Sequence, residues 1–192
     1  MAATVEGGTG TESAVETTAQ RAALAWSRVV LGLGSNLGNR LETLQGALDE
    51  ITDTPGVTVA GVSGVYETDP VGGPEQGSYF NAVVVIRTLL TPDLVLERAN
   101  SIEEAFQRVR VERWGPRTLD VDVIAFGNVE QDDPRLTLPH PRAHERAFVL
   151  APWLDVDPDA EIPGRGRVAD LLAGVGLDGV RRRDDLELTA DR

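Results

Sequence analysis

The chain has 192 residues, 41% of them hydrophobic and 26% charged, which predicts a folded protein with one ordinary domain. It contains no cysteine, and all 18 basic residues are arginine, which excludes disulfides, thiolate metal sites, a lysine phosphate loop and lysine Schiff-base chemistry. The net charge of −13 argues against broad binding of nucleic acid, because neutralisation of phosphates dominates that affinity.

The first part of the chain, residues 1–25, shows almost no apolar periodicity and predicts a disordered tail. Beyond it, apolar runs of β-like composition predict strands, and apolar residues three to four positions apart predict helices. In chain order, these patterns predict a strand at 28–33, a helix at 37–51, strands at 57–66 and 79–88, a helix at 92–106 and a strand at 118–126.

The order β-α-β-β-α-β predicts an α+β fold, the ferredoxin-like sandwich, in which an antiparallel sheet carries two helices on one face. Irregular C-terminal additions follow, with a short helix expected at 168–175. We expect a single folded domain over 26–180 and a charged C-terminal tail over 181–192.

The strand at 118–126 carries two acidic residues, Asp120 and Asp122. Strand side chains alternate between faces, so both carboxylates point one way while Leu119, Val121 and Val123 point the other. Two close carboxylates repel each other unless a cation or proton lies between them, and Mg²⁺ commonly binds through one or two carboxylates plus substrate phosphates. A polar stripe on a solvent-facing strand explains the pair equally well.

Four arginines precede the acidic pair, namely Arg108, Arg110, Arg113 and Arg117, with Trp114 among them. Carboxylates that hold metal, and arginines that hold phosphate oxygens, are the usual means of phosphoryl transfer. A surface cluster of salt bridges with nearby glutamates is the alternative. The direct succession of arginines and carboxylates favours phosphoryl transfer.

Tyr79 and Asn81 lie two positions apart on a predicted strand and therefore share a face. A ring beside an amide suits a flat heteroaromatic ligand, although these residues alone fit a core aromatic beside an edge polar residue better. His140 lies between two prolines and could reach a phosphate, but a lone loop histidine is more often incidental. The glycine-rich run 32–38 has the wrong spacing for a dinucleotide fingerprint and predicts a tight turn from strand to helix.

Several segments together resemble the 6-hydroxymethyl-7,8-dihydropterin pyrophosphokinase family. The most specific is the run RWGPRTLDVDVI at 113–124. The segments 34–37, 66–81 and 136–141 resemble the same family in the same order, so the resemblance covers roughly 28–158.

The resemblance implies an ATP:hydroxymethyldihydropterin diphosphotransferase of folate biosynthesis, with the family's ferredoxin-like fold. Pyrophosphate would pass from ATP, the co-substrate, to the hydroxyl of 6-hydroxymethyl-7,8-dihydropterin, and AMP would leave. Two Mg²⁺ ions would be held by Asp120 and Asp122.

The resemblance also implies three groups of site residues. The catalytic residues would be Arg108, Arg110, Arg117, Asp120 and Asp122. The residues around ATP would be Asn100, Glu103, Arg110, Arg113, Arg117, His140 and Arg146. The pterin would contact Thr68, Asp69, Val71, Tyr79, Asn81, Trp114 and Phe148, with its ring stacked between Tyr79 and Phe148.

Three features depart from the family's pattern. Asp69 follows the threonine of the pterin loop, where the family often has proline. Pro141 follows the loop histidine, where relatives can have an aromatic residue. The loop between Arg110 and Trp114 is slightly shorter than in the family.

Two other functions remain compatible with the residues. Another magnesium-dependent nucleotidyl transferase on a ferredoxin-like sheet would share the paired aspartates but would not need the stacking pocket. A non-catalytic ligand-binding module of the same shape would need no metal.

For partners we expect ATP and the dihydropterin, with no nucleic acid and no membrane, and we expect a cytoplasmic monomer. No apolar run reaches the ~18 residues needed to span a bilayer. The N-terminus lacks the basic start and apolar stretch of a secretory signal.

Overall fold

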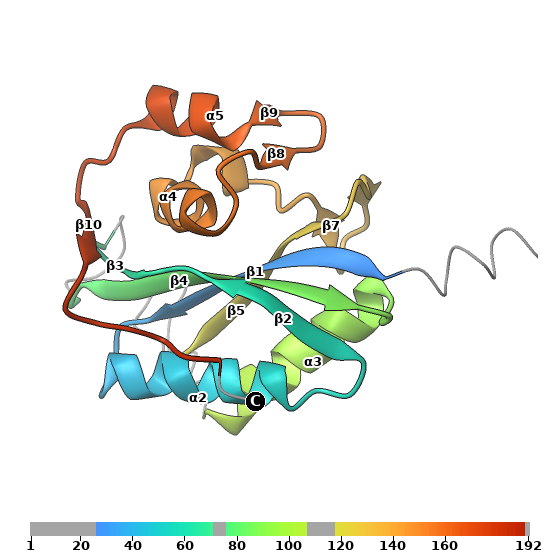
Figure 1. Ribbon diagram of the computed structural model, residues 1–192, viewed down its shortest axis with the longest axis horizontal. Helices are drawn as coiled ribbons and strands as arrows, with labels where there is room; N and C mark the ends of the chain where they lie inside the picture. The colour runs from blue at the N-terminus through green and yellow to red at the C-terminus, as the bar shows by residue number, and fades with distance from the viewer. Residues whose placement is uncertain (1–25, 71–75, 107–117, 191–192) are drawn as a thin grey trace, which may run out of the picture.

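The computed structural model describes residues 26–70, 76–106 and 118–190 (Figure 1). Their centre is a six-stranded antiparallel sheet with the strand order β10-β3-β4-β1-β5, in which β2 also pairs with β4. The strands are β1 (Ser27–Ser35), β2 (Val57–Val62), β3 (Val65–Thr68), β4 (Tyr79–Thr88), β5 (Asp120–Phe126) and β10 (Val180–Arg183).

Helices cover both faces of this sheet. Helices α2 (Arg40–Thr52) and α3 (Pro92–Ala105) lie on one face, and α4 (Ala147–Val156) and α5 (Val168–Val175) lie over the other (Figure 1). The first two helices and the sheet confirm the ferredoxin-like sandwich, and the C-terminal additions supply the cover of the second face.

The predicted strand at 57–66 is divided into β2 and β3 by Ser63 and Gly64. The Ser63 hydroxyl accepts a hydrogen bond from the Val83 N–H at 2.8 Å, and the Ser63 N–H donates to the Val83 carbonyl at 2.9 Å. The Ser63 hydroxyl thus replaces a backbone carbonyl as the acceptor of one hydrogen bond between the strands, and the chain continues along the same edge of β4.

The two predicted helices begin at side-chain caps. The Asn39 side chain accepts from the Glu42 N–H at the start of α2, and the Thr91 hydroxyl accepts from the Leu94 N–H at the start of α3. Helix α2 begins at Arg40 rather than at the predicted residue 37, because Gly38 has a positive φ of 62° that no helix continues through.

Two apolar layers result. The layer between the sheet and α2 and α3 contains alternate residues of each central strand, such as Leu31, Leu33 and Val121. The layer beneath α4 and α5 contains the intervening residues, such as Val83 and Ile124.

The charge of 181–192 predicts a tail, but its described part belongs to the fold. Arg181 to Arg183 pair with β3, and Leu188 is buried in the layer beside α2. The Gln45 carboxamide bonds both the N–H and the carbonyl of Thr189, at 3.0 and 2.7 Å. Backbone pairing and the buried Leu188 hold this segment although most of its side chains are polar.

Short elements complete the described chain. They are the hairpins β6 (Gln131–Asp132) with β7 (Thr137–Leu138) and β8 (Glu161–Ile162) with β9 (Gly166–Arg167), and the 3-10 turn η1 (Ala143–Glu145). None of the helices in the described ranges has the length and apolar character needed to cross a membrane. The expected tail at 1–25 lies outside these ranges.

Candidate active site

The paired aspartates lie on the sheet face beneath α4. Leu119, Val121 and Val123 are buried in the layer beside α3, while Asp120 and Asp122 are half-buried on the opposite face. The structure therefore confirms the alternation that the sequence predicts, and the two carboxylates lie side by side on β5.

The backbone of β1 beside the aspartates carries no side chains. Gly34 pairs with Asp120 and Gly32 pairs with Asp122, so these positions share a face. A Cβ added at Gly34 would lie 3.1 Å from the Asn81 Oδ1 and 4.0 Å from the Asp120 Cβ, and one at Gly32 would lie 4.0 Å from the Asp122 Cβ. The two glycines keep open a cradle that an alanine would partly fill.

The predicted role of the glycine-rich run is thus partly wrong. Gly32 and Gly34 are strand residues within β1, and in the described run 32–38 only Gly38 has a positive φ. The sequence signal that distinguishes these roles is the spacing, because glycines two apart clear one face of a strand.

Arg146 and His140 border Asp122. The Arg146 Nη1 lies 3.6 Å from the Asp122 Oδ2, and its guanidinium lies 5.5 Å from the centroid of the Phe148 ring. At 3.6 Å the ion pair is longer than a hydrogen bond, and the Asp122 side chain remains 47% exposed. The pair therefore leaves Asp122 accessible to a cation.

The loop that carries His140 runs along the outer edge of β5. The His140 N–H donates to the Ile124 carbonyl at 2.8 Å, and the Nδ1 of its ring accepts from the Arg142 N–H at 3.1 Å. A neutral ring therefore carries its proton on Nε2. Burial lowers the pKa of His140, and the charge of Asp122 opposes that shift.

Glu103 and Asn100 lie on α3. Glu103 is 3% exposed, and its Oε1 accepts the Val121 N–H at 2.9 Å. The carboxylate thereby satisfies a backbone donor on the outer edge of β5, directly between the two aspartates in sequence. Asn100 is exposed. Contacts of either residue with ATP remain a prediction.

Tyr79 and Asn81 share the face of the aspartates, as their spacing predicts. Asn81 pairs with Gly34, which pairs with Asp120 on its other side, so the three form one row across the sheet. Since neighbouring strands are about 4.8 Å apart, Asn81 and Asp120 lie roughly 10 Å from each other. The buried Asn81 Nδ2 donates to the Thr68 Oγ1 at 2.7 Å, and the Tyr79 hydroxyl bonds Gln76 at 3.0 Å.

Phe148 lies in the first turn of α4 and packs against the layer that contains Val83 and Val85. The far end of this helix is tied to the sheet through Asp155. Its Oδ2 accepts the Gly64 N–H at 3.3 Å, and the Tyr66 hydroxyl bonds the same carboxylate. These contacts fix α4 over the face that carries Asn81.

Burial, and then the neighbouring Asp155, raise the pKa of Tyr66 from 10.0 to about 12. The folded state therefore favours the protonated phenol. This contribution to the free energy of unfolding is fully present below the ordinary pKa and is lost as the pH rises through the folded pKa.

We therefore expect Tyr66→Phe to flatten the fall in melting temperature between about pH 10 and pH 12. The measurement is clean because the chain has no lysine and no cysteine and has only two tyrosines. Thermal melts of wild type and variant across this range check it, and phenolate absorbance should show one late titration that the variant lacks. Identical pH dependence in both proteins would contradict the assignment.

Six predicted site residues lie outside the described part of the chain: Val71, Arg108, Arg110, Arg113, Trp114 and Arg117. The structure places most of the others on one face of the sheet, from β3, β4, β5, the His140 loop and the start of α4. Asn100 and Glu103 instead lie on α3, which covers the other face. Sequence reasoning missed the tie between Tyr66 and Asp155 and the strand β10, because their partners are far apart in the chain.

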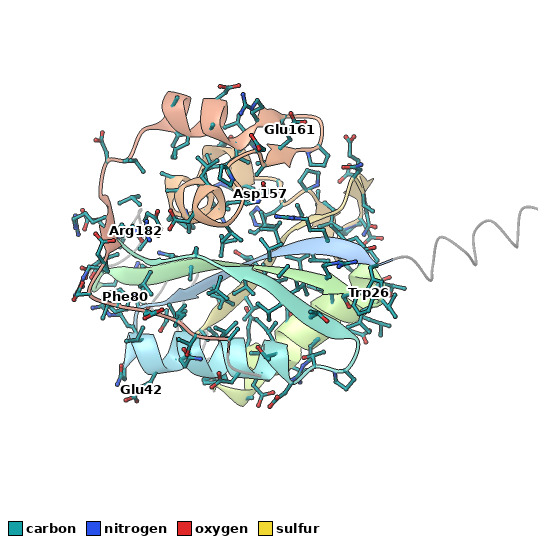
Figure 2. All side chains as sticks on the ribbon, viewed as in Figure 1. Trp26, Glu42, Phe80, Asp157, Glu161 and Arg182 are labelled. Atoms are coloured by element: carbon teal, nitrogen blue, oxygen red, sulfur yellow. The ribbon has the colours of Figure 1, made fainter. Side chains whose placement is uncertain are left out.

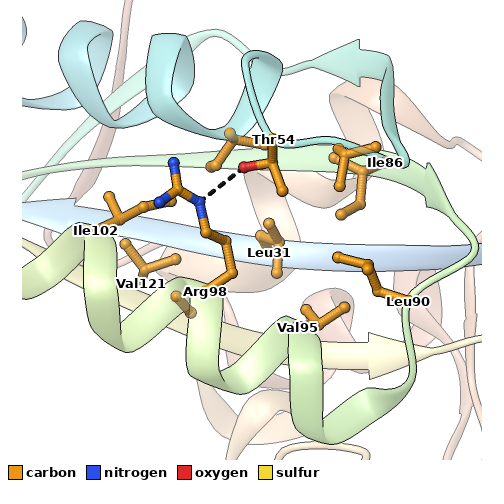
Figure 3. Close-up of a pocket in the computed structure, with 11 residues that line it drawn as sticks. Leu31, Thr54, Ile86, Leu90, Val95, Arg98, Ile102 and Val121 are labelled. Atoms are coloured by element: carbon orange, nitrogen blue, oxygen red, sulfur yellow. Dashed lines mark hydrogen bonds between the residues drawn. The ribbon is translucent and has the colours of Figure 1, made fainter.

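Two hollows lie near these elements. One, of about 20 Å³, is apolar, lies between α2 and α3 on the face away from the aspartates, and is bordered by Arg98, whose Nε donates to the Thr54 Oγ1 at 2.8 Å (Figure 3). A hollow of this size holds at most one water and is not a substrate site. The other, of about 450 Å³, lies between the hairpins β6-β7 and β8-β9 and has His140 in its wall.

The fold and the row of polar side chains define a ferredoxin-like domain with a candidate site on one face of its sheet. The chain belongs to the 7,8-dihydro-6-hydroxymethylpterin-pyrophosphokinase family, whose model matches residues 30–158. It is 44% identical over 156 residues to 2-amino-4-hydroxy-6-hydroxymethyldihydropteridine pyrophosphokinase of Methylorubrum extorquens, covering 81% of this chain and 98% of the relative. It is 49% identical over 152 residues to the Mycobacterium leprae protein of the same name, covering 73% and 78%.

Solved structures show the same fold. An HPPK-DHPS in complex with substrates aligns with a TM-score of 0.64 at 12% identity, over 82% of this chain and 46% of that one. The wild-type Plasmodium falciparum HPPK-DHPS with pterin and p-hydroxybenzoate aligns with a TM-score of 0.60 at 12% identity, over 82% and 45%. The chain thus spans about half the length of these solved chains.

Proposed function

We propose that this chain transfers pyrophosphate from ATP to the hydroxyl of 6-hydroxymethyl-7,8-dihydropterin on the sheet face that carries Asn81, Gly34 and Asp120. Membership of the family, and relatives named for this activity at 41% to 49% identity, support the reaction. The observation that carries the assignment of the site is the row itself. The row has the buried Asn81 amide at one end and the Asp120 carboxylate at the other, with Asp122 two residues further along the same face of β5.

Asp120 and Asp122 would hold the two Mg²⁺ ions. The donor set fits, because two carboxylates share a face over a cradle that a Cβ at Gly34 would partly fill. The described ranges offer no group of three or more His, Cys, Asp or Glu that could hold a metal, so phosphates and water would supply the other ligands, as Mg²⁺ prefers. When bound, Mg²⁺ neutralises the charge on the phosphate oxygens.

The ATP side would use groups that border Asp122. The Arg146 guanidinium is a permanent cation that can bind phosphate oxygens, and the Nε2–H of His140 is a donor in the same region. Asn100 and Glu103 on α3 are proposed to contact the nucleotide from the outer edge of β5. Sequence alone supports the phosphate contacts of Arg108, Arg110, Arg113 and Arg117.

The pterin side would use the other end of the row. The ring is proposed to stack between Tyr79 and Phe148 while the Asn81 amide bonds its edge. Backbone groups of Thr68 and Asp69 would complete the contacts, and sequence alone supports those of Val71 and Trp114.

In the reaction, the hydroxyl oxygen of the pterin forms a bond to the β-phosphorus. The bond from that phosphorus to the oxygen bridging the α- and β-phosphates breaks, AMP leaves, and the hydroxyl proton is released. The protein positions the two substrates and forms no covalent bond with either, which agrees with a chain that lacks cysteine and lysine.

Incubation with ATP, Mg²⁺ and the hydroxymethyl dihydropterin tests this proposal. We expect AMP to appear in equal amount to the pterin diphosphate. Formation of ADP would indicate a different kinase, release of free pyrophosphate would indicate a nucleotidyl transferase, and the absence of turnover would favour a binding module.

Gly34→Ala provides a test of the cradle. The added Cβ would lie 3.1 Å from the Asn81 Oδ1, so the amide that donates to Thr68 must give by a few tenths of an ångström. We expect kcat/KM for the pterin to fall roughly tenfold, the factor for about 1.4 kcal/mol. Gly174→Ala is the matched control, because nothing lies within 4 Å of a Cβ there. Equal kinetics of the two variants would remove the proposed role of Gly34.

A further inference from the structure

We infer that strand β10 holds the end of β3, Thr68 and Asp69, in position for substrate binding, and that Arg181 and Asp69 are positioning residues for the pterin. The contacts of Gly179, Val180 and Arg181 with Thr68 and Asp69 are called the clamp below. The inference rests on the proposed function, because it concerns the pterin end of that site. It gives the C-terminal segment, which lies beyond the family match at 30–158, a role in substrate binding.

Asp69 is held at its backbone and at its side chain. Its N–H donates to the Gly179 carbonyl at 2.9 Å. Its carboxylate accepts two hydrogen bonds from Arg181, one at 2.8 Å to Oδ1 and one at 3.5 Å to Oδ2. These bonds lower the pKa of Asp69 and so keep its carboxylate charged.

The turn before β10 is shaped to receive this side chain. Gly179 has a positive φ of 70°, which favours glycine, and a Cβ at this position would lie 3.1 Å from the Asp69 Oδ2 and 3.4 Å from the Asp69 Cβ. The close approach places the Gly179 carbonyl within reach of the Asp69 N–H.

The clamp reaches the site through Thr68. This residue is 4% exposed, pairs with Val180 on one side and Tyr79 on the other, and accepts the Asn81 amide at 2.7 Å. If the end of β3 moves, the hydroxyl that orients Asn81 moves with it, and so do the backbone groups that would face the pterin.

The same strand holds β3 on its opposite face through Glu67. This carboxylate accepts from the Arg183 Nη1 at 2.9 Å and from the Ser78 hydroxyl at 2.6 Å. Arg183 also lies 5.5 Å from the centroid of the Phe80 ring, at the end of the sheet where Figure 2 shows both Phe80 and Arg182. Ser78, the residue before Tyr79, is thereby joined to Glu67 of β3, and Glu67 is joined in turn to Arg183 of β10.

The ion pair of Arg181 with Asp69 is too exposed to be important for the stability of the fold. The side chains of Arg181 and Asp69 are 55% and 58% exposed, and ion pairs this exposed contribute little to stability. The ion pair of Arg28 with Asp157 has the same length of 2.8 Å, and its side chains are 50% and 28% exposed. Asp157 lies away from Phe80 and Arg182 in Figure 2. Arg28→Ala is therefore the control for the loss of an arginine that forms an ion pair elsewhere on the surface.

Steady-state kinetics of Arg181→Ala, Asp69→Ala and the double variant test the clamp. We expect KM for the pterin to rise roughly fivefold in each single variant, with kcat, KM for ATP and the melting temperature nearly unchanged. The double variant should be no worse than the singles, because both remove one shared interaction. Arg181→Lys should recover part of the loss, since lysine can make one of the two bonds.

An unchanged KM for the pterin in Arg181→Ala, or an equal rise in Arg28→Ala, would overturn the clamp while AMP formation by the wild type upholds the proposed function. Additive losses in the double variant would also overturn it. A wild-type chain that forms no AMP would overturn the proposed function and this inference together.

Discussion

Asp120→Asn and Asp122→Asn are each expected to lower kcat by roughly 10²- to 10³-fold, the loss typical of removing one charged group from a phosphoryl-transfer site. Each substitution keeps the shape of the side chain and removes its charge. Because neither side chain belongs to the apolar layers, the melting temperature should not fall. It can even rise, since the two carboxylates repel each other in the absence of a cation.

Asp53→Asn controls for the loss of one acidic side chain. Asp53 is exposed at the C-terminal end of α2, on the opposite face of the sheet from the aspartates. Its kinetics should match those of the wild type. Normal turnover in the double variant of Asp120 and Asp122 would remove the carboxylates from the mechanism, and a collapse of the melting temperature would assign them to the fold instead.

Asn81→Ala is expected to reduce kcat/KM for the pterin by about 10²-fold, because it removes the proposed bond to the ring edge and leaves the buried Thr68 hydroxyl without its donor. The stability should also fall, by about 1 to 2 kcal/mol, since both groups are buried. KM for ATP should change little, because Asn81 lies two strands from Asp120.

Thr68→Val separates the two effects on Asn81. It removes the acceptor of the Asn81 amide and keeps the shape of the side chain, so the loss in pterin kinetics should be smaller than for Asn81→Ala. Asn128→Ala, in the exposed turn after β5, is the control for loss of an amide. A larger effect on KM for ATP than on KM for the pterin would place Asn81 at the wrong end of the site.

The alternation of residues in the sequence was sufficient to predict which side chains share a face of the sheet. Alternation on β5 and β4 places Asp120, Asp122, Tyr79 and Asn81 together, because a strand has no freedom in which face each residue occupies. The order of elements was sufficient to predict the ferredoxin-like sandwich, since few topologies satisfy β-α-β-β-α-β.

Other features depend on partners that the local pattern does not specify. Strand β10 consists mainly of arginines, and only its pairing with β3, more than one hundred residues earlier, makes it a strand. The sequence pattern around Gly32 and Gly34 predicts a turn, and only the positions of their neighbours across the sheet, Asn81 and Asp120, show that these glycines leave space on one face of a strand. Helix α4 packs on the sheet through Val149, Leu150 and Trp153, and its tie through Asp155 to Tyr66 and Gly64 is one that no spacing predicts.

The most direct test is whether the carboxylates of Asp120 and Asp122 hold divalent ions against a triphosphate. Electron paramagnetic resonance can measure the binding of Mn²⁺ in the presence of a non-hydrolysable ATP analogue. The wild type should bind two ions per chain more tightly than the nucleotide binds them alone, and the double variant Asp120→Asn with Asp122→Asn should lose that gain. Equal binding of Mn²⁺ by both proteins would contradict the account.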